Sequence, residues 1–241
     1  MMDFDTAPCF KLRYMANDDK IGFLFDLDGV LIDSETEYTR IWTAIAREFY
    51  RTPEGEIPDD DQARNVALRI KGQTLTHILD EYFPDPDIQK EVTVMLDILE
   101  QRMRYNWLPG AKELLEQIAD AGYDAVLVTS SNEMKMKHLR EERPDLETYF
   151  KAIVSADMIK HSKPDPEGYE LGARLIGAKP ARCAVFEDSV QGVAAGRRAG
   201  AYVAGVAGTV DAERLKENSD MIVSSLAEIN LDKLISILHS R

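Results

Sequence analysis

Short apolar runs recur through the C-terminal part of the chain, and amphipathic helical segments separate them. A brief apolar run bounded by turn residues is typical of a strand that is buried on both faces of a sheet. Strands are predicted just before Asp26 and at 124–128, 152–154, 183–186, 202–206 and 221–223. Because helices alternate with these strands, the pattern predicts an α/β fold with a Rossmann-like parallel sheet and right-handed crossovers.

Between the first two predicted strands, the spacing of the apolar residues changes. They recur there at intervals of three or four residues, which is typical of amphipathic helices. The pattern predicts a helix over 33–49 that starts with Ser34 and Glu37 as a capping box. It then predicts a polar loop over 51–61 and two more helices with apolar faces at 75–82 and 88–103. No buried strand is predicted in this segment, so it should form a small all-α unit.

These patterns divide the chain into three predicted parts. Residues 21–32 and 108–241 form the α/β core, and residues 33–107 form the inserted helical unit. Two chain crossings, near Asp33 and Trp107, are expected to connect the two and to act as a hinge. Residues 1–20 form an N-terminal extension to which the sequence assigns no role.

Composition narrows the class of protein. The chain has 241 residues, of which 44% are hydrophobic and 30% are charged, so it can bury a sizeable core. A net charge of -14 argues against binding to nucleic acid or to an anionic membrane surface. Cys9 and Cys183 imply no disulfide framework. The sequence has neither a secretory signal nor an apolar run that could span a bilayer, so a cytoplasmic location is predicted.

Asp26 and Asp28 follow the first predicted strand and are two residues apart. Residues i and i+2 of an extended chain point the same way, so both carboxylates should share one face at the carboxyl end of the strand. Each carboxylate disfavours ionisation of the other unless a cation lies between them or one holds a proton. Since such a pair destabilises the fold, a role in chemistry is the better explanation.

Polar residues also follow the other predicted strands, at the edge of the sheet where the site of an open α/β fold lies. They are Thr129, Ser130, Ser131 and Asn132 after the second strand, Lys163 in the loop after the third, and Glu187 and Asp188 after the fourth. Carboxylates are hard oxygen ligands for Mg²⁺, and the start of a helix binds anions. With a lysine and a nucleophile added, the set predicts phosphoryl transfer, in which positioning and charge neutralisation do most of the catalysis.

Four motifs together carry a family resemblance: Asp26-Leu27-Asp28-Gly29-Val30, the loop that begins at Thr129, Lys163-Pro164, and Glu187-Asp188-Ser189-Val190-Gln191-Gly192. With this combination the chain resembles the haloacid dehalogenase superfamily. Within it, the chain is similar to the β-phosphoglucomutase-like group, which has an α-helical cap. The likeness runs from about residue 21 to residue 223 and implies that residues 33–107 are this cap.

The resemblance implies a role for each residue of the site. Asp26 is the expected nucleophile, which becomes an aspartyl phosphate, and Asp28 is the expected general acid and base. Thr129 should hydrogen-bond the phosphoryl oxygens, and Lys163 should neutralise charge between the nucleophile and the phosphate. The other expected substrate contacts are Ser130, Ser131 and Asn132 in the core and Gly72 and Gln73 in the cap.

The same resemblance implies Mg²⁺ as the cofactor. The expected ligands are the Asp26 carboxylate, the Asp28 backbone carbonyl and Asp188. Glu187 is expected to be either a further ligand or a neighbour of the ligands.

Two departures from the mutase pattern bear on the reaction. The mutase has an arginine where this chain has Leu75, and a histidine where it has Tyr38. We therefore expect a phosphatase for a small phosphorylated metabolite, such as a sugar or polyol phosphate. A phosphosugar mutase and a non-catalytic phosphate-binding module are the alternatives. No nucleic-acid or membrane partner is expected, and the chain is expected to be a monomer or a weak homodimer.

Overall fold

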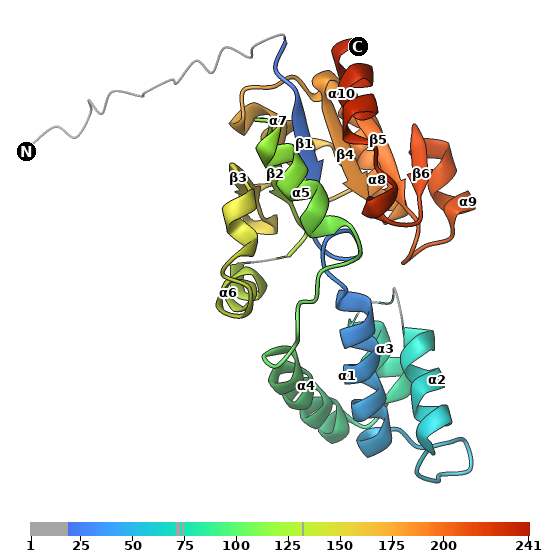
Figure 1. Ribbon diagram of the computed structural model, residues 1–241. Coiled ribbons are helices and arrows are strands. Elements are labelled where there is room, and N and C mark those ends of the chain that lie inside the picture. The colour runs from blue at the N-terminus through green and yellow to red at the C-terminus, as the bar shows by residue number, and fades with distance from the viewer. Residues whose placement is uncertain (1–18, 71–72, 74, 132) are drawn as a thin grey trace, which may run out of the picture.

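The computed structural model describes residues 19–70, 73, 75–131 and 133–241, which form a parallel sheet flanked by helices and a separate helical bundle (Figure 1). The sheet has six strands in the order β3-β2-β1-β4-β5-β6, and every pairing is parallel. All carboxyl ends therefore meet at one edge. The strands are β1 (Gly22–Phe25), β2 (Asp124–Val128), β3 (Ala152–Val154), β4 (Cys183–Glu187), β5 (Tyr202–Val206) and β6 (Met221–Val223).

Helices cover both faces of the sheet. α5 (Ala111–Asp120) and α10 (Leu231–His239) share a core with Phe23 and Phe25, whereas α7 (Glu167–Leu175) and α8 (Val190–Arg198) share another with Leu24. Consecutive residues of β1 thus enter opposite cores, which explains its uninterrupted apolar run. The other elements of this part are α6 (Glu133–Glu142), α9 (Ala212–Leu215) and 3₁₀ segments at Leu146–Tyr149, Ala156–Met158, Pro180–Arg182, Lys216–Asn218 and Leu226–Glu228.

The bundle, called the cap below, contains α1 (Ser34–Phe49), α2 (Asp60–Ile70), α3 (Leu75–Tyr82) and α4 (Pro86–Glu100). It buries apolar residues such as Ile45, Val66 and Val92, and Trp42 stacks on Phe83 with ring centroids 6.4 Å apart. In Figure 1 the strands of the sheet point toward the cap. The cap therefore lies beyond the edge at which the strands end.

Two linkers connect the cap to the sheet and run side by side. The Asp33 N–H donates to the Asn106 carbonyl at 3.0 Å, and the Leu108 N–H donates to the Leu31 carbonyl at 2.8 Å. Because these backbone bonds tie the two crossings together, the entry to α1 and the exit from α4 are held at one point next to the strand ends.

The strand predictions are confirmed. β2, β3, β5 and β6 have the predicted bounds, and β4 continues one residue further, to Glu187. Helix α2 is not among the predicted helices. Its buried residues Ala63, Val66 and Ile70 have helical spacing, but Asp60 and Asp61 at its start extend the polar loop before it and hide the boundary.

The predicted capping box at the start of α1 is wrong. The N-cap is Asp33, whose carboxylate accepts a hydrogen bond from the Thr36 N–H at 3.0 Å. Ser34 is the first residue inside the helix and is buried, and its side chain hydrogen-bonds Asp28 instead. Ser34 thus hydrogen-bonds the aspartate that follows β1, whereas Asp33 caps the N-terminus of α1.

Residues 1–18 of the predicted N-terminal extension lie outside the described residues. Among the residues that the structure does describe, no helix combines the length and apolar character needed to cross a membrane.

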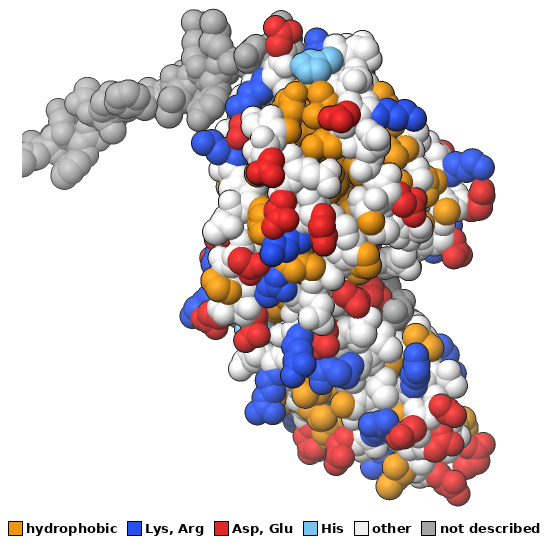
Figure 2. All heavy atoms as spheres, in the orientation of Figure 1, with side chains coloured by type: hydrophobic (Ala, Val, Ile, Leu, Met, Phe, Trp, Pro, Cys, Tyr) orange, Lys and Arg blue, Asp and Glu red, His pale blue; other side chains and the backbone are white. Residues whose placement is uncertain are grey.

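Figure 2 shows acidic side chains gathered at the far end of the cap, over the loop between α1 and α2. Part of the negative charge of the chain therefore lies away from the strand ends.

Candidate active site

Three carboxylates from two neighbouring strands meet at the carboxyl edge of the sheet. Asp26 directly follows β1, Glu187 ends β4, and Asp188 follows it. All three side chains are buried, and one oxygen of each lies within 4.8 Å of the others. The structure therefore brings together carboxylates that lie about 160 positions apart in the chain, as parallel strands require.

Lys163 reaches into this group from the loop after β3. Its Nζ lies 2.5 Å from Asp26 Oδ1 and 2.5 Å from Glu187 Oε1, and it donates to the Val128 carbonyl at 3.3 Å. Burial by itself would lower the pKa of Lys163, but the charges of Asp26 and Glu187 raise it well above its ordinary value. The lysine is therefore a permanent cation between the two carboxylates.

Glu187 is held by protein donors on both oxygens. Tyr169 Oη donates to Oε1 at 2.9 Å, and the N–H and Oγ of Ser189 donate to Oε2 at 3.0 Å each. Gly192 leaves room for it, because a Cβ there would lie 1.8 Å from Glu187 Cδ. Since Lys163 takes the remaining place on Oε1, this geometry favours Glu187 as a neighbour of a metal site rather than a ligand.

The negative charges of Asp26, Glu187 and Asp188 outnumber the positive charge of Lys163 beside them. Burial raises the pKa of Asp26 well above its ordinary value, although Lys163 opposes the rise. Burial, and then the charge of Glu187, raises the pKa of Asp188 to about 7. Such shifts mark a site that lacks a counter-charge, and hard oxygen donors suit Mg²⁺. Gly29 leaves room for Asp188, since a Cβ there would lie 1.9 Å from its Oδ2. The residues present thus fit a divalent cation.

Asp28 faces a second lysine, Lys135, which is not among the predicted site residues. Lys135 Nζ on α6 donates to Asp28 Oδ1 at 2.9 Å and to Oδ2 at 2.8 Å, and Ser131 Oγ donates to Oδ2 at 3.3 Å. Burial alone would raise the pKa of Asp28, but Lys135 and the hydrogen bonds lower it. The two aspartates, expected to share one face, therefore have different partners and opposite pKa shifts.

The predicted anion cradle follows β2. Thr129 is buried and its Oγ1 accepts from the Ser131 N–H at 3.0 Å. Ser130 lines a cavity of about 190 Å³ with Asp26, Asp28, Lys163 and Asp188. Asn132, the last predicted contact of this loop, lies outside the described residues. The cavity is lined by carboxylates and by the ammonium group of Lys163. Positive charge at such a place stabilises a phosphoryl group during its transfer.

Two larger pockets that share lining residues, together called the cap recess below, adjoin this cavity. The outer part of the recess has a volume of about 340 Å³ and its inner part about 650 Å³, and the two share Tyr38, Asp97 and Glu100. The inner part is lined by Asp28 and Ser130 as well, so it opens onto the phosphate-sized cavity. The cap recess is therefore a space into which a leaving group attached to a phosphate at the strand ends could extend.

Of the two predicted cap contacts, only Gln73 is described. It lines the outer cap recess beside Leu75, and its Nε2 donates to the Arg69 carbonyl at 2.9 Å. Its Oε1 is buried and has no hydrogen-bond partner within the described part of the chain. Gly72 lies outside the described residues.

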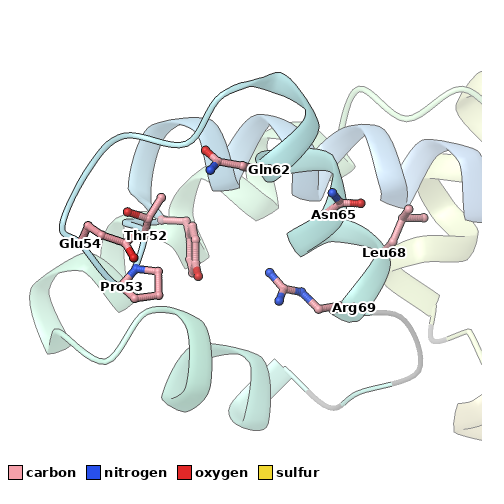
Figure 3. Close-up of a pocket in the computed structure, with 8 residues that line it drawn as sticks. Thr52, Pro53, Glu54, Gln62, Asn65, Leu68 and Arg69 are labelled. Atoms are coloured by element: carbon pink, nitrogen blue, oxygen red, sulfur yellow. The ribbon is translucent and has the colours of Figure 1, made fainter.

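The cap carries another pocket, on its outer side, with a volume of about 570 Å³. Figure 3 shows Arg69 extending into it from α2, opposite Thr52 and Pro53 of the preceding loop. Most of its lining is exposed, and none of the predicted site residues belongs to it. It is a feature of the cap surface and not part of the catalytic cleft.

Known proteins share this sequence and architecture. A family model described as haloacid dehalogenase-like hydrolase matches residues 22–200. The chain is 34% identical to hexitol phosphatase A of Escherichia coli (strain K12) over 216 residues, covering 88% of this chain and 94% of that protein. It is 31% identical to the phosphorylated carbohydrates phosphatase of Thermotoga maritima over 183 residues, covering 73% of this chain and 80% of the other.

Solved structures of other proteins have a similar architecture. A β-phosphoglucomutase-like protein from Thermotoga maritima has 27% identity and a TM-score of 0.68, covering 91% of this chain and 99% of its own. The fold, the strand-end carboxylates and these relatives define a phosphoric monoester hydrolase that acts on a phosphorylated metabolite. The chain belongs to the haloacid dehalogenase-like hydrolase family. The family predicted from the four sequence motifs is thereby confirmed.

Proposed function

We propose that the protein is a Mg²⁺-dependent phosphatase that hydrolyses a small sugar or polyol phosphate through an aspartyl-phosphate intermediate. The observation that carries this proposal is the group formed by the buried carboxylates Asp26 and Asp188 and the partly buried Lys163 at the wall of a phosphate-sized cavity. Relatives named as hexitol and carbohydrate phosphatases support the substrate class.

In the first step, a carboxylate oxygen of Asp26 forms a bond to phosphorus while the bond from phosphorus to the leaving oxygen breaks. Lys163, which lies 2.5 Å from Asp26 Oδ1, neutralises charge on the nucleophile and the transferring group. Asp28 gives a proton to the leaving alcohol oxygen, so it must be protonated at this point, against the ion pair with Lys135 that favours its ionised form. The Thr129 hydroxyl and the Ser130 N–H bind the phosphoryl oxygens, while the Ser131 N–H donates to Thr129 Oγ1.

In the second step, a water attacks the phosphorus of the aspartyl phosphate. Asp28, now ionised, accepts the proton of that water, and the bond to the Asp26 oxygen breaks to release inorganic phosphate. The ion pair with Lys135 favours the ionised form of Asp28 in this step. Asp26 is thus restored as a free carboxylate, and Asp28 is protonated again.

Asp26, Asp188 and the backbone carbonyl of Asp28 are the groups that would hold Mg²⁺. The ion supplies the positive charge that the carboxylates lack and that the phosphoryl oxygens gain during transfer. Glu187 would fix Lys163 and the start of α8 beside it.

The mutase alternative requires a grip for a second phosphate in the cap. Leu75 lines the cap recess where the mutase has an arginine, and Asp97 and Glu100 line it with negative charge. These residues favour transfer of the phosphoryl group to water rather than to a bound sugar phosphate.

Release of inorganic phosphate from p-nitrophenyl phosphate and from a panel of sugar and polyol phosphates, with and without Mg²⁺, tests the proposal. We expect Mg²⁺-dependent release that Asp26→Asn abolishes. Conversion of β-glucose 1-phosphate to glucose 6-phosphate with negligible phosphate release would instead establish the mutase.

A further inference from the structure

The cap recess is predominantly acidic. Among the described residues that line it are Asp28, Glu35, Asp97 and Glu100, against a single ammonium group, that of Lys135. Lys135 is engaged by both oxygens of Asp28. The carboxylates of Asp97 and Glu100 therefore face the recess with little positive charge to balance them.

Glu100 is the acidic residue of the recess whose side chain is best held in place to recognise a ligand. It lies at the end of α4, and its side chain hydrogen-bonds that of Tyr38 on α1. Both residues line the outer and the inner part of the recess. Burial raises the pKa of Glu100, because negative charge is poorly solvated there. A ligand hydroxyl or ammonium group beside it relieves this cost, whereas another anion increases it.

Two neutral polar residues, Gln73 and His138, also line the recess. Gln73 Oε1 and His138 Nε2 are buried and lack partners within the described residues, and they belong to the outer and the inner part respectively. Trp42 and Ile78 give the outer part an apolar wall. Neutral polar atoms beside an apolar surface suit a polyhydroxylated carbon chain.

We propose that the cap recess selects phosphate esters whose leaving group carries no negative charge, and that Glu100 is the residue that determines this specificity. The inference rests on the proposed phosphatase function and narrows its substrate class. Neutral polyol or sugar esters and amino-sugar esters are accepted. Esters that carry a carboxylate or a second phosphate on the leaving group are rejected by like charge.

A groove along α1 that contains three arginines and shares Glu35 and Thr39 with the cap recess offers the main competing place for an anionic group. Arg40, Arg47 and Arg64 line it, together with Gly29 at the catalytic loop. Arg40 is paired with Glu37 at 2.8 Å, and Arg47 pairs with a carboxylate of α2 at 2.9 Å. If leaving groups entered this groove instead, Glu100 would have no influence on the choice between neutral and anionic esters.

Two matched substrate pairs test the inference. Sorbitol 6-phosphate and 6-phosphogluconate differ by a carboxylate, and glucosamine 6-phosphate and glucose 6-phosphate differ by an ammonium group. We expect kcat/KM for sorbitol 6-phosphate to exceed that for 6-phosphogluconate by about tenfold or more. Glu100→Gln, which keeps the shape and removes the charge, should reduce this ratio by about threefold or more and weaken any preference for glucosamine 6-phosphate.

Glu91→Gln is the matched control, since it makes the same charge change at an exposed position of α4 outside the recess. It should leave the ratio unchanged. Tyr38→Phe removes the hydroxyl that fixes Glu100 and should also reduce the ratio of the two kcat/KM values. This variant replaces Glu100→Gln in the test if Glu100→Gln fails to fold. Equal kcat/KM values within the first pair, or a ratio that neither variant changes, would overturn the inference alone. No phosphate release from any of these esters or from p-nitrophenyl phosphate would overturn the proposed function as well.

Discussion

Lys135 and Asp28 form an ion pair across the entrance of the site, with Nζ 2.9 Å from Oδ1 and 2.8 Å from Oδ2. Burial would raise the pKa of Asp28, but the charge and hydrogen bonds of Lys135, with those of Ser34 and Ser131, hold it below its ordinary value. The pair favours the ionised carboxylate, which is the form that accepts a proton from water. Lys135 therefore connects α6 to the proton-transfer step.

Replacing Lys135 by methionine should weaken this effect. We expect the pKa of Asp28 to rise, so the acid limb of kcat for p-nitrophenyl phosphate should move to higher pH. This ester has a leaving group that needs no protonation, so its kcat reports the step in which Asp28 acts as base. Lys137→Met, at an exposed position of the same helix, is the control and should keep the wild-type profile. Identical profiles for both variants would contradict a role for Lys135 in proton transfer.

Gly192→Ala should disturb the site without touching a substrate. The added Cβ would lie 1.8 Å from Glu187 Cδ, so either α8 or the carboxylate must move. Because Glu187 positions Lys163, we expect kcat to fall at least about tenfold and the free energy of unfolding to fall by about 1–3 kcal/mol. Steady-state kinetics and denaturant unfolding measure the two. Gly208→Ala, whose Cβ meets nothing within 4 Å, should change neither. A fully active Gly192→Ala protein would show that the position of Glu187 is unimportant.

Removal of Mg²⁺ should make stability depend on pH through Asp188. Its pKa is raised to about 7 by burial and by Glu187, so the folded protein binds this proton more tightly than the unfolded chain does. Without metal, the free energy of unfolding should therefore fall as pH rises from about 4 to about 7. Mg²⁺ binds the ionised carboxylates and should raise Tm most above neutral pH.

Asp188→Asn separates this effect from the other carboxylates. Without metal and above neutral pH, the variant should have a Tm higher than the wild type by about 3 °C or more, because a buried negative charge is removed. It should also lose most of the Tm increase that Mg²⁺ gives. Thermal unfolding with chelator and with Mg²⁺ measures both quantities. An undiminished Mg²⁺ effect would exclude Asp188 as a ligand.

The sequence predicted the sheet and its strand ends because a strand buried on both faces is a continuous apolar run with visible limits. The sequence alone therefore predicts that Asp26 and Asp188 lie beside each other. The positions of Lys135 and Glu100 could not be predicted in this way, since they lie on helices whose polar faces look alike in sequence. Which of those faces meets the strand ends depends on how α6 and α4 pack, and the two partners Lys135 and Asp28 are 107 positions apart.

Gly192 shows a similar limit of sequence reasoning. A glycine in a helix that packs on a sheet suits close contact with apolar strand residues, but the close neighbour of Gly192 is the Glu187 carboxylate. A sequence pattern can indicate that a helix approaches something closely. Only the register between β4 and α8 identifies what it approaches.

Asp28→Asn should separate the two proposed half-reactions. Because p-nitrophenolate leaves without a proton, Asp26 should still be phosphorylated by p-nitrophenyl phosphate, whereas hydrolysis of the intermediate loses its base. We expect kcat to fall by about 10²–10⁴-fold. A rapid burst of p-nitrophenol, about equal in amount to the enzyme, should precede the slow phase and be visible in stopped-flow absorbance.

With sorbitol 6-phosphate the same variant should give no burst of sorbitol, because that alcohol leaves only when Asp28 protonates its oxygen. The contrast between the two esters is the control for folding, since a misfolded protein would fail with both. Loss of the burst with p-nitrophenyl phosphate in a protein of wild-type Tm would mean that Asp28 is needed for attack itself. The hydrogen bonds from Lys135 and Ser131 would then serve to position Asp28 rather than to set its proton affinity.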